Sequence, residues 1–340
     1  MLFSDILGQE RAKSFLGRVI ASGKIPHAYL FTGIPGIGKT STAQALATAL
    51  NCSGPVDGDG CGHCLACRQM VSGNFPDFLC IRPDGQNIKI DQIRDLKRRL
   101  GFSSVSGGYR VCVVCQAETM TDEASNSFLK TLEEPFPGNV LILNATEPLD
   151  LLPTIVSRCQ RVPFQPLPVG DITDWLVLKR GVKEDEARVL ARISNGSLGR
   201  ALNMHEGDFL DKRERWLLRI MGLPGGSRDK AIEIALECAG EDKNSQDDVH
   251  KDRGGITDML SVWETWYRDL LLLSTQGPDD LIVNMDFSHK LKNISRRVNI
   301  KNLIESILII DRAQRELRRM RNRTLVMEHM VLNLDRLARG

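Results

Sequence analysis

A glycine-rich run at residues 33–41 carries the clearest chemical signal in the sequence. It fits the pattern G-x-x-x-x-G-K-[ST] and supplies these candidate nucleotide-binding residues: Gly33, Pro35, Gly36, Gly38, Lys39, Thr40 and Ser41. The glycines let backbone N–H groups turn toward a triphosphate, and the helix expected next presents its positive dipole end. Lys39 would neutralise the β- and γ-phosphates, and the Thr40 hydroxyl would bind Mg²⁺. The run predicts binding of ATP or ADP with Mg²⁺; the alternative is a turn that binds nothing.

Hydrolysis of that nucleotide needs further groups, and the sequence lacks the expected ones. Phosphoryl transfer requires a carboxylate at the end of a neighbouring strand to hold Mg²⁺ and a group that orients water. The apolar strand expected near 111–114 ends in Cys115 and Gln116. A thiol is a soft ligand for hard Mg²⁺, and an amide cannot accept a proton from water. Glu118 follows, but the turn is expected to carry it away, so the sequence predicts very poor hydrolysis.

Four of the nine cysteines fall within residues 52–67, directly after the predicted phosphate-loop helix. Cys52, Cys61, Cys64 and Cys67 have the spacing with which thiolates close a tetrahedral metal site. With no open position and no acid–base group nearby, a zinc ion here would be structural. Three alternatives stay open: an iron–sulfur cluster, a rival His63 ligand, and four unrelated buried thiols.

The elements that must position these residues follow from the hydrophobic pattern. Apolar residues recur at helical spacing near the amino terminus, and short apolar runs bounded by turn residues predict strands. Helices are expected at 12–20, 40–50, 91–100 and 123–132, and strands at 27–33, 111–115 and 140–146. Strands that alternate with helices predict an α/β fold with a mostly parallel sheet covered on both faces.

A cluster of chain-breaking residues predicts a domain boundary. The breakers are Pro163, Pro166, Pro168 and Gly170. Beyond them strand signals nearly vanish, a small helical unit is expected at about 171–205, and amphipathic helices are expected from 211 onward. The polar runs 223–229 and 240–255 are expected to be loops, because neither can bury enough apolar area to form a core.

Length and composition bound the class of protein. A chain of 340 residues is expected to form two or three domains, and 42% hydrophobic with 26% charged residues is typical of globular proteins. No stretch of eighteen uncharged apolar residues and no secretory signal is found, which predicts a cytoplasmic protein without a membrane span. The net charge of +2 means that any nucleic-acid affinity must come from local patches.

Together these motifs resemble the AAA+ clamp-loader subunits of bacterial DNA polymerase III. The phosphate loop followed by a four-cysteine zinc module is that family's combination, and NSFLKTLEEP (126–135) and Ser157-Arg158-Cys159 resemble two of its signatures. The resemblance is clear over residues 1–205 and weaker in the tail, at 322–334. It implies an AAA+ nucleotide-binding domain at 1–165 with the zinc module at 52–67, a helical lid at 166–210 and a helical collar at 211–340.

Two departures from the family pattern indicate the delta-prime type. Catalytic subunits carry Asp-Glu where this chain has Cys115-Gln116, and an arginine where Gly196-Ser197-Leu198 is followed by Gly199. The intact phosphate loop points the other way, because some delta-prime subunits have lost it. The resemblance implies that Arg158 acts in trans as a finger in the neighbouring ATP site, because a guanidinium stays ionised and forks to two oxygens.

The leading interpretation is a delta-prime subunit of the DNA polymerase III clamp loader, within a nucleotidyltransferase holoenzyme. Its implied partners are tau/gamma and delta subunits in a ring, the sliding clamp and primed DNA. Whether the chain itself is an ATPase stays open. The alternatives are a tau/gamma-type motor that uses Glu118 and a zinc-stabilised DNA-binding adaptor.

Weaker signals concern charge and one strand end. Arg94 and the basic run 97–99 on one helix, and a set of arginines at 312–323, are candidates for DNA phosphate contacts, with a solvated helix face as the alternative. Asn144 and Thr146, at the end of a predicted strand, are candidates to sense the γ-phosphate.

Overall fold

The computed structural model describes residues 1–223, 228–240, 254–318 and 322–339. Contacts group the chain into two compact units, one of Met1–Val182 with Ser194–Ala201 and the other of Lys183–Ile193 with Leu202–Gly340. The predicted boundaries at 165 and 210 stay predictions. Most of the loops predicted at 223–229 and 240–255 lies outside the described residues. Among the residues described, no helix has the length and apolar character needed to cross a bilayer.

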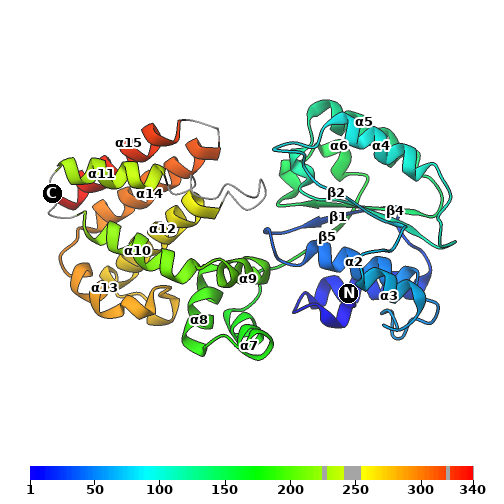
Figure 1. The fold of residues 1–340 in the computed structure, drawn as a ribbon, viewed down its shortest axis with the longest axis horizontal. Coiled ribbons are helices and arrows are strands. Elements are labelled where there is room, and N and C mark those ends of the chain that lie inside the picture. The colour runs from blue at the N-terminus through cyan, green and yellow to red at the C-terminus, as the bar shows by residue number, and fades with distance from the viewer. Residues whose placement is uncertain (224–227, 241–253, 319–321, 340) are drawn as a thin grey trace. The chain divides into compact units, whose positions relative to one another are not determined.

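The first unit is built on a parallel five-stranded sheet in the order β2-β3-β4-β1-β5 (Figure 1). The strands are β1 (Ala28–Thr32), β2 (Phe78–Ile81), β3 (Arg110–Val114), β4 (Asn139–Ala145) and β5 (Gln160–Pro163). The order is not sequential, so helical crossovers must connect the strands, as parallel pairing requires. The α/β fold and the three predicted strands are confirmed.

Both faces of the sheet are covered because its strands are apolar on both sides. Side chains alternate across a strand, so Tyr29 and Phe31 join one core cluster while Leu30 joins the other. Helices α1 and α2 cover the first face, and α4, α5 and α6 cover the second (Figure 1). Such two-sided burial is typical of parallel sheets.

The helices of this unit lie close to the expected positions. The unit also contains short 3₁₀ turns, among them η1 (Phe3–Asp5) and η2 (Ala117–Thr119). Its α-helices are α1 (Glu10–Ser22), α2 (Lys39–Leu50), α3 (Leu65–Val71), α4 (Ile90–Leu100), α5 (Asp122–Glu133), α6 (Pro153–Val156) and α7 (Val169–Arg180).

A buried ion pair fixes the end of the sheet opposite the phosphate loop. Asp77, fully buried before β2, accepts hydrogen bonds from the backbone of Val105 and Ser106 and from the Arg110 guanidinium, whose Nη2 lies 2.9 Å from its Oδ1. Burial opposes ionisation of Asp77, but these bonds outweigh it and hold its pKa below the usual value. The loop at 103–109 is thereby tied to the strands.

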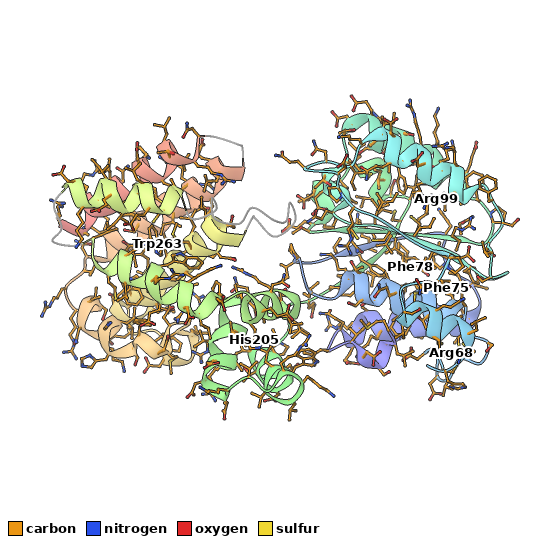
Figure 2. All side chains as sticks on the ribbon, in the orientation of Figure 1. Arg68, Phe75, Phe78, Arg99, His205 and Trp263 are labelled. Atoms are coloured by element: carbon orange, nitrogen blue, oxygen red, sulfur yellow. The ribbon has the colours of Figure 1, made fainter. Side chains whose placement is uncertain are left out.

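The second unit is helical in its described residues, as the vanishing strand signal predicts. Trp263 lies at its centre, and its indole N–H donates to the carbonyl of Trp216 at 2.9 Å (Figure 2). Helix α9 (Leu198–Glu206) begins in the first unit and continues into the second. The other helices are α8 (Glu184–Ile193), α10 (Phe209–Met221), α11 (Arg228–Ala239), α12 (Gly254–Ser274), α13 (Ser288–Ser295), α14 (Ile300–Arg318) and α15 (Arg323–Arg339).

We expect Asp77→Ala to lower the free energy of unfolding by about 3–5 kcal/mol, because it leaves the Arg110 charge buried without a counterion. Asp84→Ala removes only an exposed partner of Lys89 and should change it by about 0.5 kcal/mol or less. The measurement is urea unfolding of both variants followed by circular dichroism.

The same substitution has a pH signature. Because the folded pKa of Asp77 is lowered, its stabilisation is present above the unfolded value of about 4 and is lost as pH falls through the folded value. The stability gap between wild type and Asp77→Ala should therefore shrink in acid. A gap that is constant down to strongly acidic pH would contradict this account.

Candidate functional site

The phosphate loop joins the carboxyl end of β1 to the amino end of α2. Gly36 and Gly38 have φ of 75° and 104°, a conformation that side-chain-bearing residues rarely adopt. The Gly33 N–H donates to the Thr146 carbonyl at 3.0 Å, so the loop is anchored to the end of β4. Helix α2 starts at Lys39, which directs its first N–H groups toward the loop. Pro35 is exposed and Ser41 is half-buried on the first turn.

Lys39 folds back over this loop. Its ammonium donates to the carbonyl of Gly33 and, at 3.1 Å, to that of Ile34. Burial lowers the pKa of Lys39, and the nearby Glu118 carboxylate opposes that shift. The Lys39 ammonium is therefore held in the loop by hydrogen bonds to two carbonyl oxygens. Phosphate oxygens could take the place of these carbonyls as its acceptors.

The predicted Mg²⁺-binding hydroxyl meets polar groups from the neighbouring strand ends. Thr40 Oγ1 accepts from the Asn144 amide at 3.1 Å and lies 3.8 Å from Cys115 Sγ. Cys115 directly follows β3, so a thiol stands where phosphoryl transfer needs a carboxylate. The structure brings Thr40, Cys115 and Asn144 together, while the roles predicted for them stay predictions.

The prediction that the turn after β3 carries Glu118 away from the site is wrong. Gln116 adopts a left-handed conformation with φ of 53°, and the 3₁₀ turn η2 then folds the chain back. Glu118 Oε1 accepts from the Thr146 hydroxyl at 3.0 Å at the end of β4. Its Oε2 and the buried Asn144 Oδ1 have no hydrogen-bond partner within the described part of the chain.

The start of helix α9 lies directly on the phosphate loop. Ser197 Oγ donates to the Pro35 carbonyl at 2.8 Å, and the Gly199 N–H donates to the Gly36 carbonyl at 2.9 Å. A Cβ atom on Gly199 would come within 2.8 Å of the Gly36 oxygen, closer than real contacts. The glycine at the position where the family pattern has arginine therefore permits a backbone-to-backbone contact.

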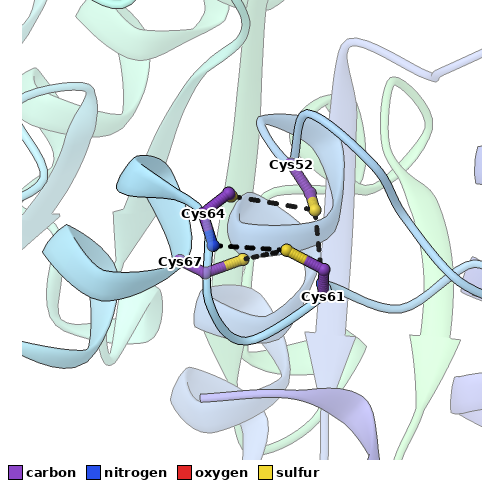
Figure 3. Close-up of side chains that lie close together, drawn as sticks. All are labelled: Cys52, Cys61, Cys64 and Cys67. Atoms are coloured by element: carbon purple, nitrogen blue, oxygen red, sulfur yellow. Dashed lines mark hydrogen bonds between the residues drawn. The ribbon is translucent and has the colours of Figure 1, made fainter.

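The four predicted cysteines form one cluster, three from the segment between α2 and α3 and Cys67 from α3 itself (Figure 3). All four sulfur atoms lie within 4.8 Å of one another, with Cys52 to Cys64 at 3.9 Å and Cys61 to Cys67 at 4.0 Å. A tetrahedral zinc–thiolate site has sulfur atoms about 3.8 Å apart, given a Zn–S bond of ~2.3 Å. The four thiols therefore fit a tetrahedral ion.

The cysteines of the cluster differ in their electrostatics: the pKa values of Cys61 and Cys64 are lowered, whereas burial raises that of Cys67. Backbone N–H groups of the knuckle, first that of His63, lower the pKa of Cys61. Burial opposes ionisation of Cys64, yet surrounding hydrogen bonds bring its pKa to about 5. The rival ligand His63 is exposed, with Nδ1 2.8 Å from the Cys61 carbonyl oxygen, and does not belong to the group of sulfur atoms.

The cluster is tied to the amino terminus of the chain. The Asp59 carboxylate, within the cysteine loop, accepts from the backbone N–H groups of Phe3 at 2.9 Å and Ser4 at 3.0 Å. It also accepts from the N–H of Gly60 at 2.8 Å. Asp59 thereby joins the cysteine loop to the 3₁₀ turn η1 at the amino terminus.

The candidate finger arginine lies between α6 and β5. Arg158 Nη2 forms an ion pair with Glu133 Oε1 at 2.7 Å, and its Nη1 donates to the Thr154 carbonyl. The Arg158 side chain is 35% exposed, so it is held but remains accessible. Glu133 belongs to the NSFLKTLEEP run, so the two signatures meet in space.

The basic residues proposed for DNA contacts are partly neutralised. Arg94 pairs with Asp91 at 3.2 Å, and Arg98 pairs with Asp95, each one helical turn away on α4. In the tail Arg315 pairs with Asp311 at 2.7 Å. The side chains at 318, 319 and 321 lie outside the described residues.

Sequence reasoning missed several residues that shape the site. The contact of Ser197 and Gly199 with the loop joins segments more than 160 residues apart, and no local pattern signals it. The sequence offers one indication that Glu133 could be the partner of Arg158, which is its place in the NSFLKTLEEP run.

The fold and the loop define a protein of the α/β class with a phosphate-loop (P-loop) motif between β1 and α2. The sequence model of the family described as "DNA polymerase III, delta subunit" matches residues 8–168. The chain is 31% identical over 332 residues to the delta-prime subunit of DNA polymerase III from Bacillus subtilis, covering 96% of each. It is 30% identical over 338 residues to the tau subunit from the same organism, covering 93% of this chain and 58% of that relative.

The chain therefore belongs to the family of DNA polymerase III clamp-loader subunits of delta-prime and tau/gamma type, and the resemblance seen in the sequence is confirmed. A solved structure of a DNA polymerase III gamma subunit-related protein from Thermotoga maritima is 20% identical and aligns with a TM-score of 0.41. The alignment covers 96% of this chain and 99% of the Thermotoga maritima chain.

Removing a bound metal should loosen the cysteine module without unfolding the sheet. The cluster closes a short local loop, while the strands are held by the two apolar clusters. Hydrogen exchange after chelation should show lost protection at residues 52–67 and retained protection in β1, β3 and β4. Added zinc should restore the protection, and melting of the whole sheet on chelation would refute this prediction.

Gly199→Arg should weaken nucleotide binding about tenfold rather than improve it, because any Cβ there collides with the phosphate-loop backbone. Gly170→Ala is the matched control, since a Cβ there meets nothing within 4 Å. Titration with a fluorescent ATP analogue measures both. Unchanged affinity in Gly199→Arg would show that the contact is dispensable.

Proposed function

We propose that the chain is the delta-prime-type subunit of a clamp loader and assists loading of the sliding clamp onto primed DNA. The chain and its delta-prime relative align over 96% of the length of each, whereas the chain spans only 58% of the tau relative. This difference in coverage supports the delta-prime type over tau. Its partners would be tau/gamma and delta subunits. The observation that carries the proposal is the thiol of Cys115 beside Thr40 in an otherwise complete phosphate loop.

The phosphate loop is proposed to bind ATP or ADP with Mg²⁺. Lys39 and the N–H groups of α2 would hold phosphate oxygens, and the Thr40 hydroxyl would bind Mg²⁺, which neutralises phosphate charge. The unpartnered oxygens of Asn144 and Glu118 support a ligand at this edge, because buried polar atoms are normally hydrogen-bonded. Thr146, bonded to Glu118, is proposed as a weaker contact.

Poor hydrolysis follows from the ligands at the strand end. Mg²⁺ prefers oxygen, and the hydrogen bond to Cys80, together with burial, raises the pKa of the Cys115 thiol. The thiol therefore stays protonated and supplies neither charge nor a hard ligand. Gln116, the next residue, is exposed and cannot act as a base.

Arg158 is proposed to act in trans. Its ion pair with Glu133 limits the conformations of a long side chain, and the exposure of both residues leaves the guanidinium open to a γ-phosphate on a neighbouring subunit. An arginine so presented stabilises the charge that spreads over the transferring phosphoryl group.

The other parts of the chain are proposed to have structural roles. The zinc module would stabilise the fold locally. Residues 166–210 would form a lid, and residues 211–340 would form a collar that joins subunits.

One observation favours a second candidate, a tau/gamma-type motor. Glu118 reaches the end of β4 and leaves one carboxylate oxygen without a partner in the described chain. From there it can accept a proton from an attacking water. Measured turnover decides between the two candidates.

In the reconstituted complex, Arg158→Ala should lower ATP turnover about a thousandfold at the neighbouring site, the scale of an arginine finger. Arg161→Ala, an exposed arginine three residues on, should leave turnover near that of the wild type. Steady-state phosphate release measures both. Equal rates for the two variants would overturn the role of Arg158.

The isolated chain should bind ATP and turn it over at a negligible rate, and Lys39→Ala should abolish the binding because it removes the phosphate-neutralising charge. Calorimetric titration and phosphate release are the measurements. Brisk Mg²⁺-dependent turnover that Glu118→Gln abolishes would instead establish the motor. Turnover unaffected by Glu118→Gln would eliminate that version.

A further inference from the structure

Two cysteines outside the metal cluster lie in contact at the edge of the sheet. Cys80 is in the edge strand β2, and Cys115 follows the end of β3; their sulfur atoms are 3.4 Å apart. The parallel register pairs Cys80 with Val113, so Cys115, two residues further on, points to the same face. The Cys115 N–H donates to the Ile81 carbonyl at 2.9 Å, and this hydrogen bond holds the ends of strands β2 and β3 side by side.

That shared face is the one covered by the phosphate-loop helix. Cys115 and Phe78 pack against the core cluster that contains α2 residues, whereas Leu79 and Ile81 pack against the opposite cluster. Cys115 Sγ is also 3.8 Å from Thr40 Oγ1. The pair therefore links the solvent-exposed edge of the sheet to the hydroxyl at the start of α2.

The two thiols differ in their chemistry. Cys80 is exposed, and the hydrogen bond from Cys115, followed by the Arg82 guanidinium, lowers the pKa of Cys80 to about 6. A large fraction of Cys80 is then thiolate at neutral pH, the form that reacts with oxidants. Cys115 is half-buried, and its sulfur atom lies 3.4 Å from that of Cys80, so the contact places a second thiol beside the nucleophilic sulfur.

We propose that Cys80 and Cys115 form an oxidation-sensitive thiol pair that a hydroperoxide converts to a disulfide beside the phosphate loop. The Cys80 thiolate attacks the terminal oxygen of the peroxide and the O–O bond breaks, which gives a sulfenic acid on Cys80. The leaving group is hydroxide from hydrogen peroxide, or alkoxide from an organic hydroperoxide. The Cys115 sulfur then attacks the Cys80 sulfur, and its proton and the sulfenic hydroxyl leave as water. The two thiols lose two electrons, and the peroxide gains them.

The disulfide would act on the nucleotide site through Cys115. A bond of ~2.05 Å requires the sulfur atoms to approach by roughly 1.4 Å. The edge strand β2 has a neighbouring strand on one side only, so it can supply part of that movement. The remainder draws Cys115 away from Thr40, which would then be held on one side only, by Asn144. This consequence rests on the proposed nucleotide binding; the disulfide itself does not.

The test uses the full chain with zinc present, treated with hydrogen peroxide and then with a thiol-alkylating reagent. Peptide mapping by mass spectrometry should find the Cys80 and Cys115 peptides joined, and a reductant should separate them. Cys80→Ser and Cys115→Ser should each abolish the link, while Cys238→Ala, which removes a buried thiol in α11, should leave it intact. Oxidation of Cys80 without a link, or no oxidation at either cysteine, would overturn the proposal.

Binding of a fluorescent ATP analogue supplies the second readout. The oxidised wild type should bind about tenfold more weakly than the reduced protein, and Cys80→Ser should bind equally well before and after peroxide. Equal affinity of linked and reduced wild type would overturn the effect on the loop. A reduced chain that binds no nucleotide would refute the proposed function, and the peptide map would still decide the disulfide.

Discussion

Parallel pairing of β1, β3 and β4 is the constraint on which the candidate site depends. Because the strands run in one direction, their carboxyl ends meet at one edge, and the loop, Cys115, Asn144 and Thr146 meet there too. No single contact holds this site together. Its geometry comes from apolar packing on both faces of the sheet, which sets the register of each strand and thereby the position of each terminal side chain.

The long, strongly apolar elements were predictable from the sequence, and the short edge elements were not. Strands β1, β3 and β4 are almost fully buried and show as apolar runs, whereas β2 and β5 have four residues each and expose much of their surface. The phosphate loop and the cysteines were found because their spacing is local. The position of Glu118 was missed because it depends on the left-handed Gln116, and residue spacing does not reveal that turn.

The chain combines a complete phosphate-loop motif with a strand end, at Cys115 and Gln116, that carries no carboxylate. The same edge carries a thiol pair, and Arg158 lies elsewhere, just before the edge strand β5, held by an acidic partner on α5. If the loop binds nucleotide and Arg158 acts in trans, as proposed, this separation suits a subunit that acts on its neighbour's phosphates as well as on its own. The cysteine module adds local rigidity at the amino terminus through Asp59.

The backbone contact between Gly36 and Gly199 restricts what the first turn of α9 can carry. Any side chain at position 199 requires the two main chains to separate first, because its Cβ atom would lie 2.8 Å from the Gly36 oxygen. A cation on this turn of α9 therefore needs coordinated changes in two segments that lie far apart in the sequence.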